Sequence, residues 1–292
     1  MFSVSALFSI NYIVSKLAMH EFAPLSFAWL RVFGAAILLN LIVPGIGFTR
    51  ADAWRIALFA LLGVVLNQTL FLTGLSLTTA HVASILITTI PIFTLLVAIA
   101  TRLERATATK VFGIALALGG ALLVIGGEGI EGLKEGFIGA LLIVGNCLAY
   151  GIYLVISKPV VTRLSAGRVV SRMFAAGAIM MLPISLPALS REHWSEIPRN
   201  AWIGLAIVII GPTVAAYLIN AWTLKFAESS LVAAYTYVQP VLTTILAWIF
   251  LGEQVRPIIG LAALMIFSGV ALTASPSPRS RGEGGRRPDE GP

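Results

Sequence analysis

Polar side chains that could bind a small molecule stand inside the long apolar runs of this chain. Asn146, Tyr150 and Tyr153 recur at i, i+4 and i+7, which places them on one face of a helix. Tyr235 and Gln239 share a second face in the same way. Hydrocarbon cannot satisfy their amide and phenol groups, so we expect these side chains either to line a central cavity or to form hydrogen bonds between helices. The candidate substrate-binding residues are Asn11, Tyr12, Arg31, Gln68, Asn146, Tyr150, Tyr153, Tyr217, Tyr235 and Gln239. Walls of this composition suit an amphipathic solute.

Arg31 is the cation placed deepest in an apolar run. It lies about eight residues into the run 23–45, roughly 12 Å deep at the rise of a helix. A charge at the centre of a membrane helix costs about 2.5–3.5 kcal/mol, so it is a functional candidate. Its planar guanidinium could meet a substrate carboxylate. The alternative is a structural pair with a helix-end carbonyl or with an acid from another loop. Lys16 and Arg172 lie nearer the ends of their runs, where snorkelling explains a cation, although Lys16 could also attract an anion.

Acidic residues are absent from the middle of the apolar runs. Asp occurs only at positions 52 and 289, and every Glu lies in a loop or at the end of a run. Proton-coupled carriers usually keep an acid or a His at mid-membrane, so no proton relay can be identified, and a facilitator mechanism fits at least as well. No HExxH or GxSxG pattern is present. We therefore expect no catalytic residue, no metal and no cofactor, and an intramembrane enzyme stays only as the alternative outside transport.

The composition indicates a membrane protein. Hydrophobic residues make up 58% of the chain and charged residues 11%, with a mean hydropathy of +0.94. Globular proteins carry about 25% charged residues. The net charge of +7 comes from cations between the apolar runs, which is typical of membrane-protein loops and argues against a nucleic-acid partner. The lone Cys147 excludes an internal disulfide.

The apolar runs predict ten transmembrane helices, since about 20 apolar residues cross a bilayer. The predicted spans are 2–19, 23–45, 56–77, 80–101, 109–127, 136–158, 168–189, 201–222, 229–251 and 256–274. Their connections are too short for a soluble domain. The tail 275–292 is rich in Ser, Pro, Gly and Arg, and we expect it to be disordered and cytoplasmic.

The second half of the chain repeats the first at an offset of 149 residues. The matches pair Pro91 with Pro240, Thr94 with Thr243, Ala98 with Ala247, Glu104 with Glu253 and Gly120 with Gly269. With both termini inside, 14 Lys and Arg residues fall on the inner side and 5 on the outer, which favours cytoplasmic termini. Five spans per copy is an odd number, so the two copies are predicted to be inverted.

Each copy carries the same succession of a proline, a Glu turn and a Gly-rich helix. The first reads Ile90-Pro91 to Leu103-Glu104, and the second Gln239-Pro240 to Leu251-Gly252-Glu253. This pattern resembles the EamA-type repeat of the drug/metabolite transporter superfamily, over residues 2–274. The resemblance implies a first repeat at 1–132, a second at 133–274, an inner-membrane location and export of amino acids or similar small metabolites. A carrier of sugar-nucleotides or phosphorylated metabolites is the alternative within transport. The early Phe8-Ser9 and the Arg102-Leu103-Glu104 turn depart from the family pattern.

The matched prolines and glycines suggest how the helices bend and pack. Pro91 and Pro240 each remove a backbone hydrogen bond, so the resulting kinks are either hinges for transport or packing features. Five glycines indicate close helix packing, and equally a dimer contact: Gly113, Gly119, Gly120, Gly260 and Gly269. The sequence thus predicts an all-α, ten-helix carrier that works by alternating access in the lipid bilayer, either as a monomer or as a homodimer.

Overall fold

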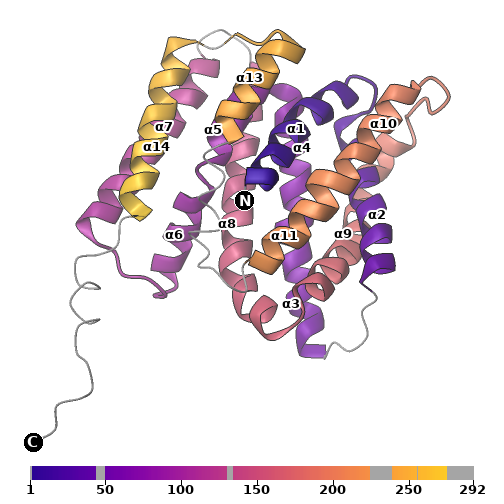
Figure 1. Ribbon diagram of the computed structural model, residues 1–292, viewed down its shortest axis with the longest axis horizontal. Coiled ribbons are helices and arrows are strands. Elements are labelled where there is room, and N and C mark those ends of the chain that lie inside the picture. Colours follow the sequence, from indigo (N-terminus) through magenta and orange to yellow (C-terminus); the bar gives the residue numbers. More distant parts are fainter. Residues whose placement is uncertain (1, 44–49, 130–133, 224–238, 255, 275–292) are drawn as a thin grey trace, which may run out of the picture.

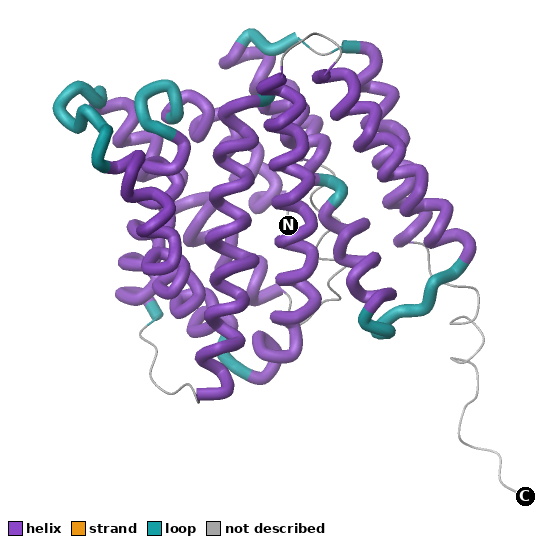
Figure 2. Tube along the Cα trace, turned by 180° about the vertical axis from the view of Figure 1, so that it is seen from behind, coloured by secondary structure: helices purple, strands orange, loops and turns teal. Residues whose placement is uncertain are grey.

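The structure is a computed structural model that describes residues 2–43, 50–129, 134–223, 239–254 and 256–274. Every regular element in these ranges is a helix, and the helices pack side by side as a bundle (Figures 1 and 2). The end of the bundle that holds the turn between α13 and α14 is called the upper end here, as it is drawn in Figure 1.

The first half of the chain forms five helical passages. They are α1 (Phe2–Ala18), α2 (Pro24–Ile42), α3 (Arg50–Ala60) continued through the π-helical η1 (Leu61–Leu66) into α4 (Asn67–Leu77), α5 (Ala80–Ile87) followed by α6 (Ile90–Ala100), and α7 (Ala108–Gly129).

The second half repeats this order. Its helices are α8 (Lys134–Arg163), α9 (Ala166–Leu189), α10 (Arg199–Val208) continued through the π-helical η2 (Ile209–Ala215) into α11 (Ala216–Thr223), α13 (Gln239–Leu251) and α14 (Pro257–Ala274). The two π-helical segments interrupt the third passage of each half, and such segments are frequent at functional sites.

Seven helical segments within the described residues are long and apolar enough to cross a membrane. The predicted count of ten is not reached by this measure. The helix α1 has 17 residues, while α13 and α14 belong to shorter apolar helices. The first part of the predicted span 229–251 and the predicted disordered tail 275–292 lie outside the described residues.

The fourth passage is interrupted rather than merely kinked. The helix α5 ends at Ile87, and α6 begins at Ile90 with Pro91 in its first turn. Pro91 has no backbone N–H to donate, and the first turn of a helix is where that loss is tolerated. Thr88 and Thr89 lie between the two helices, and their hydroxyl groups donate to the carbonyls of Ile85 and Leu86.

Glycines let the helices of the two halves approach closely. A Cβ on Gly113 of α7 would lie 2.5 Å from the carbonyl oxygen of Gly269 on α14. A Cβ on Gly74 of α4 would lie 2.8 Å from the carbonyl oxygen of Gly139 on α8. Gly113 and Gly269 therefore serve packing within one chain, and a dimer contact stays a prediction.

The two matched Glu turns share one backbone hydrogen bond. The N–H of Glu104 donates to the carbonyl of Ala98 over 3.0 Å, and the N–H of Glu253 donates to the carbonyl of Ala247 over 3.3 Å. These are positions that the sequence repeat matches. Left-handed backbone ends both helices, at Arg102 with φ 60° and at Gly252 with φ 66°. The local repeat is therefore structural as well as sequential.

Candidate functional site

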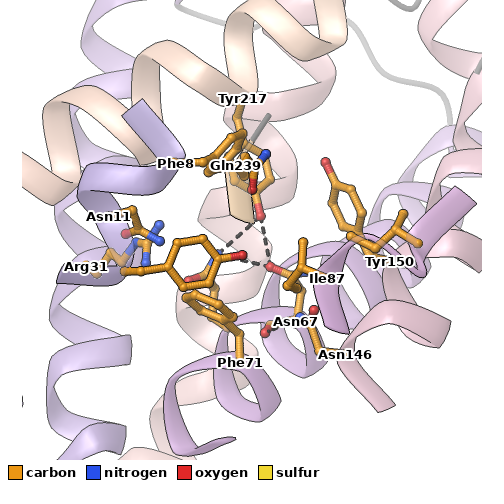
Figure 3. A pocket seen from close by; sticks show the side chains of 13 residues that line it. Phe8, Asn11, Arg31, Asn67, Phe71, Ile87, Asn146, Tyr150, Tyr217 and Gln239 are labelled. Atoms are coloured by element: carbon orange, nitrogen blue, oxygen red, sulfur yellow. Dashed lines mark hydrogen bonds between the residues drawn. The ribbon is translucent and has the colours of Figure 1, made fainter. Parts of the chain in front are cut away.

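A cavity lies within the bundle between helices of both halves (Figure 3). The helices α1, α2, α4, α8, α11 and α13 contribute side chains, together with the ends of α5 and α6 that face the break between them. Its lining residues are Phe8, Asn11, Tyr12, Arg31, Asn67, Gln68, Phe71, Ile87, Ile90, Asn146, Tyr150, Tyr217 and Gln239.

Arg31 is the charged residue of this lining. Its side chain is 2% exposed, and its Nε donates to the hydroxyl of Thr213 over 2.6 Å. That hydroxyl donates in turn to the carbonyl of Val208 over 2.7 Å, which fixes it within η2. One terminal nitrogen of Arg31, Nη1, has no hydrogen-bond partner in the part of the chain that the structure describes. A buried cation with an unused donor is suited to receive an anionic group.

The structural pair that the sequence left open for Arg31 is not observed among the described residues. The bond of Arg31 goes to a hydroxyl, not to a helix-end carbonyl or an acid. No Asp or Glu belongs to the described lining of the cavity. The positive charge of Arg31 is therefore not neutralised by a carboxylate among these lining residues.

A hydrogen-bonded network forms another part of the wall. The hydroxyl of Tyr217 donates to Oδ1 of Asn67 over 3.0 Å and accepts from Nε2 of Gln68 over 3.1 Å (Figure 3). The side-chain amide of Asn146 donates to the backbone carbonyl of Asn67 over 2.8 Å. The network fixes the side-chain amides of Gln68 and Asn146 in one orientation each.

Two acceptors of this network remain unused. Oε1 of Gln68 and Oδ1 of Asn146 are buried and have no hydrogen-bond partner among the described residues. Leaving a buried acceptor unpaired is unfavourable by about 1–3 kcal/mol. A ligand with N–H or O–H donors would satisfy both atoms.

Apolar and aromatic side chains complete the wall. Phe8, Phe71, Ile87 and Ile90 belong to the lining. Tyr12 meets Phe71 edge-to-face, with their ring centroids 5.4 Å apart. The site therefore combines a cation, free acceptors and an apolar surface, which is the makeup of a pocket for a small amphipathic molecule.

The structure brings most of the candidate residues together. The eight that line the cavity are Asn11, Tyr12, Arg31, Gln68, Asn146, Tyr150, Tyr217 and Gln239. Tyr153 is buried outside the lining, with its ring 6.2 Å from that of Phe59. Tyr235 lies outside the described residues. A role of these residues in binding substrate stays a prediction.

Five lining residues were not among the candidates. Asn67 precedes Gln68, so its polarity in an apolar run was an available signal. The sequence offered no signal for the other four, because an apolar residue in an apolar span can equally face lipid. They are Phe8, Phe71, Ile87 and Ile90.

Lys16 has a definite partner at the upper end of the bundle. Its Nζ lies 3.3 Å from Oε1 of Glu253 and also donates to the backbone carbonyl of Thr78. Lys16 is therefore held in an ion pair, which neither of the two roles considered from the sequence describes. Arg172 donates to the side chain of Asn40 over 3.3 Å.

Comparison with known proteins decides the family. The model of the EamA-like transporter family matches residues 1–126 and 137–275. The chain belongs to the EamA-like transporter family. It is accordingly a transporter of the drug/metabolite transporter superfamily and a multi-pass membrane protein with a small-molecule substrate.

Individual relatives agree with this assignment. An uncharacterized transporter of Archaeoglobus fulgidus is 26% identical over 270 residues, which cover 91% of this chain and 92% of the relative. A protein of Streptantibioticus cattleyicolor named "Probable terminal-alkyne amino-acid exporter" is 27% identical, over 86% of this chain and 83% of its own length. A solved crystal structure matches with a TM-score of 0.64 and 19% identity, covering 94% of this chain and 95% of that one, and this likeness concerns the fold alone.

Proposed function

We propose that this EamA-family chain exports amino acids or similar small amphipathic metabolites across the cell membrane. The observation that carries the proposal is the buried guanidinium of Arg31, which has an unused donor and no acid beside it in the described cavity lining. A substrate carboxylate would supply the missing negative charge and accept a charge-assisted hydrogen bond.

The remaining groups of the cavity fit the other parts of such a substrate. The free oxygens of Gln68 and Asn146 would accept hydrogen bonds from an ammonium or amide group. The side chains of Phe71, Ile87 and Ile90 would contact an apolar portion. The Streptantibioticus cattleyicolor relative is named as an amino-acid exporter, which agrees in class with this substrate.

The charge of the cavity favours a carboxylate over a phosphate. Arg31 is the one Lys or Arg among the described lining residues. A phosphorylated metabolite carries about two negative charges near neutral pH and would need further cations. We therefore place the phosphorylated-metabolite carrier second.

Transport would proceed by alternating access between two inverted five-helix repeats with cytoplasmic termini. The excess of Lys and Arg in the loops of one side supports this orientation, in which the upper end of Figure 1 faces outward. The cavity lies between helices from both halves, as expected for a site around which the halves rock. Pro91, at the break between α5 and α6, and the matching Pro240 would serve as hinges.

Flux measurements in proteoliposomes test the proposal. Purified protein is reconstituted, and efflux is followed for a panel of amino acids, their amidated forms and simple phosphorylated metabolites. We expect flux of free-acid amino acids with an apolar side chain, and little flux of the amides. Equal flux of acid and amide, or flux confined to phosphorylated compounds, would contradict the proposal.

A further inference from the structure

The carboxylate of Glu253 joins three separate segments at the upper end of the bundle. Its Oε1 accepts the backbone N–H of Ala80 over 2.8 Å, and its Oε2 accepts the backbone N–H of His81 over 3.2 Å. Oε2 also accepts Nδ1–H of His81 over 2.8 Å, while Nζ of Lys16 lies 3.3 Å from Oε1. The carboxylate thus binds the end of α1 and the start of α5 from the turn that follows α13.

Glu253 acts as the N-terminal cap of a helix that is about 170 residues distant in sequence. The N-cap residue of α5, Thr79, makes no capping bond with its own side chain. The first N–H groups of any helix need an acceptor, and here a residue of the other half of the chain supplies it. The bonds therefore contribute most when the two halves are together at this end.

The helices joined in this way are also helices that line the cavity. α1 contributes Tyr12 one turn below Lys16, α5 contributes Ile87 about two turns below Ala80, and α13 contributes Gln239. A path from the upper side to the cavity between these helices would require α13 to part from α1 and α5. That movement would break every contact of Glu253 named above.

The matching residue of the first half has no such role in this structure. Glu104 is 41% exposed, against 9% for Glu253, and within the described residues it pairs with Lys110 of the following helix over 2.5 Å. The turns around both residues share the same backbone bond to Ala98 or Ala247. The two glutamates thus share this backbone bond and differ in their side-chain contacts.

We propose that Glu253, with Lys16 and the N-terminus of α5, is a lock that holds the upper side of the transport path closed. The lock rests on the proposed alternating access. In the closed state, the charge-assisted bonds of Glu253 hold the two halves together at the upper end. These bonds all break together when the path opens.

The ionisation of Glu253 supports this assignment. Burial disfavours the charged carboxylate, but hydrogen bonds from His81 and Ala80 and the charge of Lys16 outweigh burial and hold the pKa at about 2. The carboxylate is therefore ionised in the closed state at every pH that a cell meets.

Thiol labelling tests the lock without any substrate. The chain has one Cys, the buried Cys147, so Cys147→Ala gives a cysteine-free background. A single cysteine at Ile87 reports on the cavity, and one at the exposed Gln254 identifies the upper side. A membrane-impermeant thiol reagent is then added from that side of sealed vesicles.

We expect Glu253→Gln to raise the labelling rate of Ile87→Cys from the upper side by about tenfold, because the amide keeps the shape of the carboxylate but loses its charge. The matched control is Glu104→Gln, which changes the corresponding residue of the other repeat and should leave this rate within about twofold of the parent. Melting temperatures of all variants verify that they are folded.

The outcomes separate the lock from the proposed substrate. An unchanged labelling rate in folded Glu253→Gln, or an equal rise in Glu104→Gln, would overturn the lock even if amino acids are transported. Faster labelling in Glu253→Gln alone, with no flux of amino acids in the parent protein, would support the lock and refute the substrate class.

Discussion

Replacing Arg31 by lysine keeps a cation in the cavity and removes the fork of the guanidinium. In the structure Nε of Arg31 donates to the hydroxyl of Thr213 over 2.6 Å, and Nη1 has no partner among the described residues. A lysine has one nitrogen, which cannot occupy both positions. The variant must therefore lose either its anchor to η2 or its contact with the substrate.

The size of the effect follows from the bond that is lost. Hydrogen bonds to charged groups contribute about 1.5–3 kcal/mol, so the dissociation constant of a free-acid amino acid should rise about 10- to 150-fold. An amidated amino acid has no carboxylate to lose, and its affinity should change little. Calorimetric titration of both compounds into the purified parent and variant measures the two effects.

Arg172→Lys is the matched control. Arg172 precedes Met173 and Phe174 in the second half as Arg31 precedes Val32 and Phe33 in the first. It binds Asn40 and lies outside the cavity lining. Its replacement should leave both affinities unchanged. If Arg31→Lys weakens acid and amide equally and lowers the melting temperature, Arg31 holds the helices together and the reasoning about the site is refuted.

Four further experiments address topology, coupling, hinges and pH. A reporter fused after Pro292 should be cytoplasmic and one in the loop 128–135 external; activity of a periplasmic reporter at the C-terminus would contradict the orientation. Collapsing the pH gradient with an ionophore should change amino-acid flux in proteoliposomes little, because no acid lies in the middle of a predicted span; accumulation that vanishes with ionophore would reveal a proton relay. Pro91→Ala and Pro240→Ala supply an N–H and favour continuous helices, so transport should slow more than binding weakens; wild-type flux in both folded variants would leave only a packing role. Because the pKa of Glu253 falls from an ordinary 4.5 to about 2 on closure, the lock is stabilised above pH 4.5 and weakened as the pH drops toward 2; the labelling rate of Ile87→Cys divided by that of the exposed Gln254→Cys at the same pH, which removes the pH dependence of thiol reactivity, should therefore be constant between pH 5 and 8, and a steep change of this ratio would show that another group controls the lock.

The sequence predicted the class of the protein and most of the cavity wall. Charged residues are rare and apolar runs are long, so the chain had to cross a membrane as helices. Asn146 and Tyr150 line the cavity, which is one of the two roles that their shared helix face left open, and Asn146 also donates to the carbonyl of Asn67 on α4. These inferences succeeded because a polar group in hydrocarbon is unfavourable unless it is hydrogen-bonded or faces a cavity.

The same helix face also shows where sequence reasoning ends. Tyr153 shares the face of Asn146 and Tyr150, yet it lies outside the cavity lining and packs near Phe59. A helix face extends along the whole span, whereas the cavity occupies only part of that length. Periodicity gives the direction of a side chain but not the depth at which the cavity ends.

The tertiary structure alone decided which distant residues meet. The partner of Arg31 is Thr213, which is 182 positions away in the sequence. Thr213 lies in the π-helical segment η2, which no local sequence pattern predicted. The sequence identifies Glu253 only as the match of Glu104 in a turn, and only the packing of the two halves brings it to the start of α5. Sequence periodicity is a local property set by the solvent on each side of a helix, whereas these contacts depend on the relative placement of helices, which packing across the whole bundle determines.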